Sequence, residues 1–171
     1  MSWQIQILRA KPNPAGKDSS HGRPIPQQLL AEWADLKNTG DAAVRLSSLH
    51  LANTQFGPAC QIHKQAQIYW TGPASLTLQP GETVRVHTGR ESEAWLMNQE
   101  DRLGVQYHAF ANRGSFVLNN DCGDNLGVWW QAQDEKWHRD DAASYDPYPP
   151  EGQVLQRSGD KLVPAFIFAG R

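Results

Sequence analysis

Residues 32 to 41 read Glu-Trp-Ala-Asp-Leu-Lys-Asn-Thr-Gly-Asp, an alternating segment that ends in turn residues. Its even-numbered residues, Ala34 to Asn38, fall on one side of an extended chain, and its odd-numbered residues, Trp33 to Lys37, fall on the other. Asn-Thr-Gly-Asp then favours a turn, because Gly and Asn tolerate a positive φ. The segment predicts a strand whose apolar face packs against further strands.

Short apolar segments between turn residues predict those further strands near residues 3–7, 44–51, 68–70, 76–78, 84–87, 107–110, 116–118, 126–130 and 137–145. The apolar phase reverses at Ser47-Ser48, which predicts a bulge or a tight bend. Pro80-Gly81 predicts a turn. Residues 90–103 contain neither Gly nor Pro and predict a short helix. Residues 53–67 show no clear period.

Many short strands with at most one short helix predict an all-β protein, a sandwich of antiparallel strands, with a small closed barrel as the structural alternative. The prolines between Pro147 and Pro150 end a domain that we expect over residues 1–150, because a central strand cannot continue through them. Residues 151–171 are expected to form a C-terminal hairpin or tail. Its apolar end, Phe166 to Phe168, predicts a homodimer, because an apolar strand needs an edge to join.

Composition narrows the classes of partner and compartment. A net charge of −2 and a pI near 6.3 give no polycation signature for nucleic acid. The N-terminus lacks a basic region followed by an apolar core, and no apolar run approaches the roughly 20 residues of a membrane helix. Cys60 and Cys122 lack metal or redox spacing, so we interpret them as reduced thiols of a cytoplasmic protein, with a single disulfide as the alternative.

Five segments, in order, resemble the lamin tail domain family: residues 32–40, 46–51, 78–86, 119–124 and 141–145. Pro12 to Gly16 also resembles the opening loop of that family. The resemblance implies an immunoglobulin-like β-sandwich that binds protein or nucleic acid, and prokaryotic members often accompany hydrolases. It implies a stand-alone member of prokaryotic type, since the chain has no heptad run of a lamin rod.

Catalytic and metal-binding signals are weak. No pair among the six histidines shows the spacing common in zinc sites, so we predict no metal site and no cofactor. The turn from Asp121 to Asp124 has oxygen ligands that suit calcium, but backbone bonding by Asn and Asp around a positive-φ Gly123 explains it better. No nucleophile motif is present, and we predict no enzymatic activity.

Aromatic residues give the better signal for binding. Trp129 and Trp130 are neighbours on a predicted strand, so only one can enter the core. If Trp130 lies inside with Leu126 and Val128, Trp129 lies outside. Trp33 and Trp137 are predicted to share that outward position, and exposed aromatic residues often mark binding surfaces. Coverage by loops or by the tail is the alternative.

Basic residues on one strand give a second candidate surface. Arg85 and His87 alternate with the apolar Val84 and Val86, so we expect them to face solvent, and with Arg90 and Arg102 they form a weakly basic patch that suits phosphate. The function predicted from all of this is a non-catalytic interaction module that binds a protein partner through strand edges and exposed aromatic residues. A nucleic-acid-binding module and a metal-dependent hydrolase, or an accessory domain of one, are the alternatives.

Overall fold

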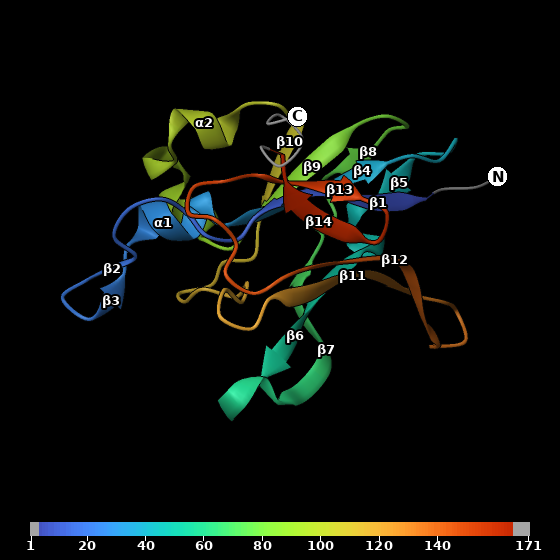
Figure 1. Cartoon of the computed structure of the whole chain (residues 1–171). Helices are drawn as coiled ribbons and strands as arrows, with labels where there is room; N and C mark the ends of the chain where they lie inside the picture. Colours follow the sequence, from blue (N-terminus) through green and yellow to red (C-terminus); the bar gives the residue numbers. More distant parts are fainter. Residues whose placement is uncertain (1–3, 166–171) are drawn as a thin grey trace.

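The alternating segment forms strand β4 (Trp33–Asn38), as predicted, inside one large sheet. The computed structural model describes residues 4–165. The order of the sheet is β10-β9-β4-β1-β13-β14-β12-β11-β6-β7. The other strands of the sheet are β1 (Ile5–Lys11), β6 (His50–Phe56), β7 (Ile62–Thr71), β9 (Thr83–His87), β10 (Tyr107–Phe110), β11 (Asp124–Gln131), β12 (Trp137–Tyr145), β13 (Leu155–Ser158) and β14 (Lys161–Pro164). Figure 1 shows the sheet, from which the hairpin of β6 and β7 projects.

The fold is mostly β, and its large mixed sheet is nearly barrel-like. Most neighbouring strands are antiparallel, as expected, but β9 pairs with β10 and β12 pairs with β14 in parallel. Two small sheets pair β2 (Ser19–Ser20) with β3 (Arg23–Pro24) and β5 (Val44–Arg45) with β8 (Thr77–Leu78). The prediction of purely antiparallel strands is therefore wrong.

The prediction of at most one short helix is also wrong. The described residues contain two short α-helices, α1 (Pro26–Ala31) and α2 (Gln99–Arg102), with 3-10 turns η1 (Leu46–Ser48), η2 (Pro58–Cys60) and η3 (Glu91–Leu96). Pro26 stands in the first turn of α1, where its fixed φ suits a helix and its missing N–H is not needed. The predicted helix over residues 90–103 is divided into η3 and α2.

Turn chemistry was the most reliable local signal. The reversal of phase at Ser47-Ser48 is achieved by η1, where the Leu49 N–H donates to the Leu46 carbonyl at 2.9 Å. Gly81 adopts a φ of 86° in the predicted turn. Residues 116–118, by contrast, do not form the predicted strand, because two of their backbone N–H groups donate to a buried carboxylate instead of a neighbouring strand.

Apolar side chains from both halves of the sheet pack into one core. Ile7, Leu36 and Val86 come from the half around β4, and Leu51 and Val128 come from the half around β6 and β11. All five are fully buried. The alternation of apolar and polar residues therefore predicted the core-facing side of these strands correctly.

The C-terminal hairpin of β13 and β14 forms as predicted, but it lies inside the sheet, between β1 and β12. The expected boundary at residue 150 therefore does not separate the hairpin from the sheet. Phe166 to Phe168, on which the homodimer was predicted, lie outside the described residues.

Candidate functional site

Arg85, predicted to face solvent, is instead buried in an ion-pair network. Its Nε and one terminal nitrogen donate to the two oxygens of Asp35 at 2.8 and 2.9 Å. Its other terminal nitrogen donates to the carbonyls of Asp101 and Leu103, at 3.0 and 2.9 Å. The guanidinium lies 3.6 Å from the centre of the Trp33 ring. Four of its five N–H groups donate to protein acceptors, so Arg85 is a structural anchor for the segment that contains α2.

Trp33 was also predicted to be exposed, and it is buried. Its indole Nε1 donates to Asp101 at 2.8 Å, and Lys11 donates to the same carboxylate oxygen at 2.8 Å. The physical reason is that both faces of β4 are covered, one by the core and the other by Asp101 of α2 and the side chains that bind it. Of the predicted basic patch, Arg90 and Arg102 are exposed.

His87 is completely buried, which corrects its expected solvent exposure. Its Nδ1 lies 2.6 Å from the Leu30 carbonyl, and its Nε2 lies 2.8 Å from His108 Nδ1. Because a carbonyl only accepts, His87 Nδ1 carries the proton and its Nε2 accepts from His108 in the neutral form. Burial lowers the pKa of His87 to about 3, so the ring stays neutral in the folded protein.

Glu32 is a second fully buried ionisable group. One of its oxygens accepts from Thr88 Oγ1 at 2.5 Å and from the Val117 N–H at 3.1 Å, and the other accepts from the Leu118 N–H at 3.2 Å. Burial raises the pKa of Glu32 to about 8, against the opposing effect of these hydrogen bonds. Such a group could exchange a proton, but it holds residues 117–118 in place instead of facing a cleft.

The shifted pKa values of Glu32 and His87 predict that the protein is most stable in mildly acidic solution. The pKa of Glu32 rises from 4.5 to about 8 on folding, so the free energy of unfolding falls as pH rises through that range. The pKa of His87 falls from 6.5 to about 3, so the free energy of unfolding falls as pH drops through that range. The two slopes cancel between pH 4.5 and 6.5. Urea unfolding should show a loss of about 2 kcal/mol towards pH 8 and another of about 2 kcal/mol towards pH 3.

Single substitutions separate the two contributions. In Glu32→Gln the fall above pH 6.5 should be reduced, whatever the absolute stability of the variant, because the titrating carboxyl is gone. His87→Gln should likewise reduce the acid-side fall. A free energy of unfolding that rises steadily from pH 5 to 8 in the wild-type protein would contradict the assignment.

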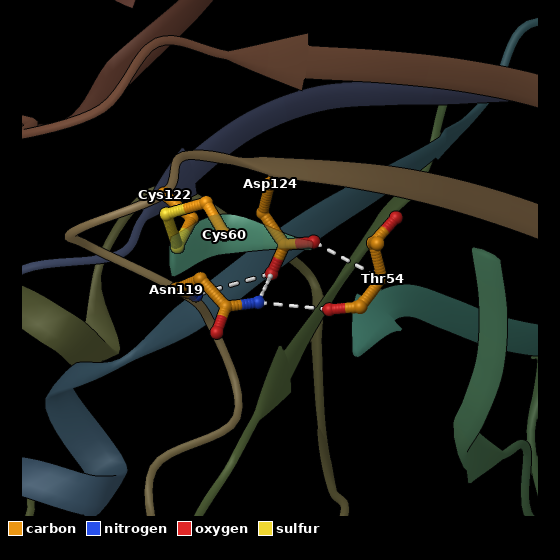
Figure 2. The surroundings of a disulfide bond; sticks show 5 residues. All are labelled: Thr54, Cys60, Asn119, Cys122 and Asp124. Carbon is orange, nitrogen blue, oxygen red and sulfur yellow. Dashed lines mark hydrogen bonds between the residues drawn. A yellow bond between two sulfur atoms is a disulfide. The ribbon is translucent and has the colours of Figure 1, made fainter. Parts of the chain in front are cut away.

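The two cysteines form a disulfide, so the interpretation as reduced thiols is wrong. Figure 2 shows that Cys60, from the tip of the β6–β7 hairpin, joins Cys122 beside Asp124. Pairing of distant cysteines was left open by the sequence because no spacing pattern reveals how a fold brings them together.

Asp124, next to that disulfide, organises the predicted polar turn. Its carboxylate accepts from the backbone N–H groups of Thr54, Asn119 and Asn125 and from the side-chain amides of Asn53 and Asn119, at 2.8 to 3.1 Å. Gly123 adopts a φ of 69°. This confirms the backbone-bonding interpretation of the turn. Burial raises the pKa of Asp124.

The surface that brings predicted site residues together is the outer face of β12, β11, β6 and β7. Three adjoining cavities of about 200, 430 and 430 Å³ form one groove across it. The first is the aromatic patch, defined here as Ala66, Ile68, Trp129 and Trp137. The second is the polar trough, defined as Ala52, Gln65, Asn125, Gly127, Arg139 and Ala142. The third continues along β12 to Asp140 and Asp160.

The floor of the trough lies close to the backbone of the sheet because three small residues lie in register across adjacent strands. Ala142 pairs with Gly127, and Gly127 pairs with Ala52. A Cβ at Gly127 would lie 2.8 Å from Trp129 Nε1 and 3.6 Å from Arg139 Cδ. Gly127 therefore gives room for the Trp129 indole to lie across the strand, and its role is space and not backbone conformation.

Trp129 and Trp137 meet at the aromatic patch as the sequence suggested, but Trp130 does not enter the core. A register shift after Val128 breaks the alternation of β11, and the half-buried Trp130 ring stacks on His138 at 4.5 Å. Trp137 remains 43% exposed. Binding by these tryptophans stays a prediction.

The sequence missed the polar half of the groove and the exposed Trp95. Gln65, Asn125 and Arg139 come from three strands, and only the sheet register brings them together. A glycine within a strand often marks a close approach, so Gly127 was an available signal. Trp95, on η3, is 76% exposed and was assigned only to a predicted helix.

Comparison with protein-family models and with curated proteins found no match for this chain. Over residues 4–165 no group of three or more His, Cys, Asp or Glu side chains could hold a metal ion. None of the helices described is both long and apolar enough to cross a membrane.

Proposed function

We propose that this protein is a non-catalytic interaction module that binds a protein partner through the aromatic patch. The observation that supports this most is the meeting of Trp129 and Trp137 beside Ile68, which is 38% exposed, on one open sheet face. Protein interfaces concentrate their binding energy in such aromatic clusters, which lie at the centre of a polar rim. His50, which contacts Trp137, and Arg139, which lies near Trp129, supply polar groups around this cluster.

The face of the sheet is a better candidate than its edges. β7 is the terminal strand, but its pairing with β6 is interrupted by three register shifts. Bulges twist an edge strand and disfavour continuous pairing with another chain. The opposite edge, β10, is only four residues long. We therefore place the partner on the aromatic patch.

The test is a pull-down from lysate of the source organism with matched variants. A protein captured by the wild-type protein should be lost, by at least tenfold in recovery, with Trp129→Ala/Trp137→Ala. The same protein should be retained with Trp95→Ala, which removes an equally large exposed indole from another element. Partners that remain bound to the double variant would place the interaction elsewhere.

The alternative of nucleic-acid binding has less support, because Arg85 and His87 of the predicted patch are buried. Nuclease treatment of the same lysate distinguishes protein binding from nucleic-acid binding, since recovery of a partner that depends on nucleic acid would vanish. The hydrolase alternative predicts stoichiometric metal in purified protein, which elemental analysis would detect.

We also propose the finer assignments of a lamin tail domain and an immunoglobulin-like sandwich. Their support is the order of the five segments that resemble that family. A crystal structure with two separate facing sheets would agree with it, and a closed barrel would contradict it. The disulfide argues against the cytoplasmic location first expected, since disulfides persist mainly in oxidising compartments. A thiol-alkylation assay on protein taken directly from cells would show whether the cysteines are free or disulfide-bonded. The result would decide between the cytoplasm and an oxidising compartment.

A further inference from the structure

We infer that the polar trough is a binding site for a neutral oligosaccharide. This site adjoins the aromatic patch, with which it shares Trp129, but it does not depend on a protein partner. The trough has three properties that together fit this class of ligand: unpaired planar polar groups, a low floor beside an indole, and neighbouring charges of both signs.

The polar groups come from three neighbouring strands. Gln65 on β7, Asn125 on β11 and Arg139 on β12 line the same cavity. Within residues 4–165 the side chains of Gln65 and Asn125 make no hydrogen bond, and Arg139 makes no ion pair. The Arg139 guanidinium lies 6.0 Å from the centre of the Trp129 ring. An amide both donates and accepts, and a guanidinium offers several donors in one plane. Vicinal sugar hydroxyls, which also donate and accept, can satisfy all three groups.

The shape of the trough suits a ring. Its volume of about 430 Å³ lies within the range of small-ligand sites, roughly 300–1,000 Å³. The small side chains of Ala142 and Ala52 keep the floor low on either side of Gly127, which the Trp129 indole crosses, so a flat ligand can approach the sheet there. Trp129 forms one border and gives an apolar surface for the C–H face of a pyranose.

The charge around the trough favours a ligand without a charge of its own. Arg139 is the charged residue of the trough itself, and the adjoining cavity adds the carboxylates of Asp140 and Asp160. Asp141, which also lines that cavity, is paired with Arg157 at 2.6 Å. A phosphate or uronate near Arg139 would face these carboxylates, which is why a neutral saccharide fits better than an acidic one.

The experiment is affinity electrophoresis of the whole chain in gels that contain mixed-linkage β-glucan, xyloglucan, galactomannan or dextran, with polygalacturonate as the acidic probe. We expect retardation by at least one neutral polysaccharide. Calorimetry with its hexasaccharide fragment should then give a Kd at least tenfold weaker for Gln65→Ala/Asn125→Ala. Both positions are exposed, so this variant should fold, and its thermal midpoint checks that it does. Trp95→Ala should bind like the wild-type protein.

Three results would overturn the inference: no retardation by any of the four neutral polysaccharides, equal binding by the folded Gln65→Ala/Asn125→Ala variant, or stronger retardation by polygalacturonate. Failure here is distinct from failure of the protein-binding proposal. Ile68→Ser alters the aromatic patch alone and should reduce capture of protein without changing saccharide affinity, whereas Gln65→Ala/Asn125→Ala should do the reverse.

Discussion

Arg85→Met is expected to lower the free energy of unfolding by about 3–5 kcal/mol, because it leaves the fully buried Asp35 without its bidentate partner. Methionine fills a similar volume, so the loss reports charge and hydrogen bonding more than a cavity. The carbonyls of Asp101 and Leu103 also lose their donor. Urea unfolding monitored by circular dichroism measures the effect.

Arg9→Met is the matched control for this change. Arg9 also contacts Asp35, at 3.0 Å, but its side chain is 24% exposed, so water can replace it and the expected loss is smaller. Asp35→Leu combined with Arg85→Met should be less destabilised than the sum of the single variants, because no unpaired buried charge remains. A cost below about 1 kcal/mol for Arg85→Met would show that the anchor contributes little.

Cys60→Ser is expected to lower the free energy of unfolding by about 4 kcal/mol, because the disulfide closes a loop between residues 62 positions apart and restricts the unfolded chain. The bond also joins the tip of the β6–β7 hairpin to the turn that Asp124 organises (Figure 2). Denaturant curves recorded with and without a reductant measure the same quantity without a substitution.

The double variant Cys60→Ser/Cys122→Ser separates loss of the bond from effects of a free thiol. It should match Cys60→Ser, and added reductant should change neither variant. If reductant leaves the unfolding midpoint of the wild-type protein unchanged, the cross-link does not contribute to stability in solution.

Local signals in the sequence predicted much of the fold. The alternation around Leu36 and Val84 located two strands of the core, and the turns at Ser47-Ser48 and Gly81 formed as expected. Periodicity could not reveal which polar faces are covered, because coverage depends on segments distant in sequence. The face that carries Arg85 looked solvated, and only the docking of the segment containing α2 buries it.

The candidate site was predicted only in part, because local patterns do not show which distant residues the fold brings together. Trp129 and Trp137 were selected by residue type and by the two-residue period, which act locally. The trough depends on Ala52, Gly127 and Ala142, which are unremarkable alone and form a floor only through the register of three strands. A register shift next to Trp129 also moved Trp130 out of the core, which no alternation pattern could indicate.

The position of the β13–β14 hairpin has a consequence for how the chain reaches its native state. β1 pairs with β13 through Ala10 and Leu155, so a strand from the beginning of the chain closes against one from near its end. During synthesis β1 must wait, with one side unpaired, until β13 has been made. Such distant pairings slow folding, and a chain held in this waiting state exposes a strand edge to aggregation.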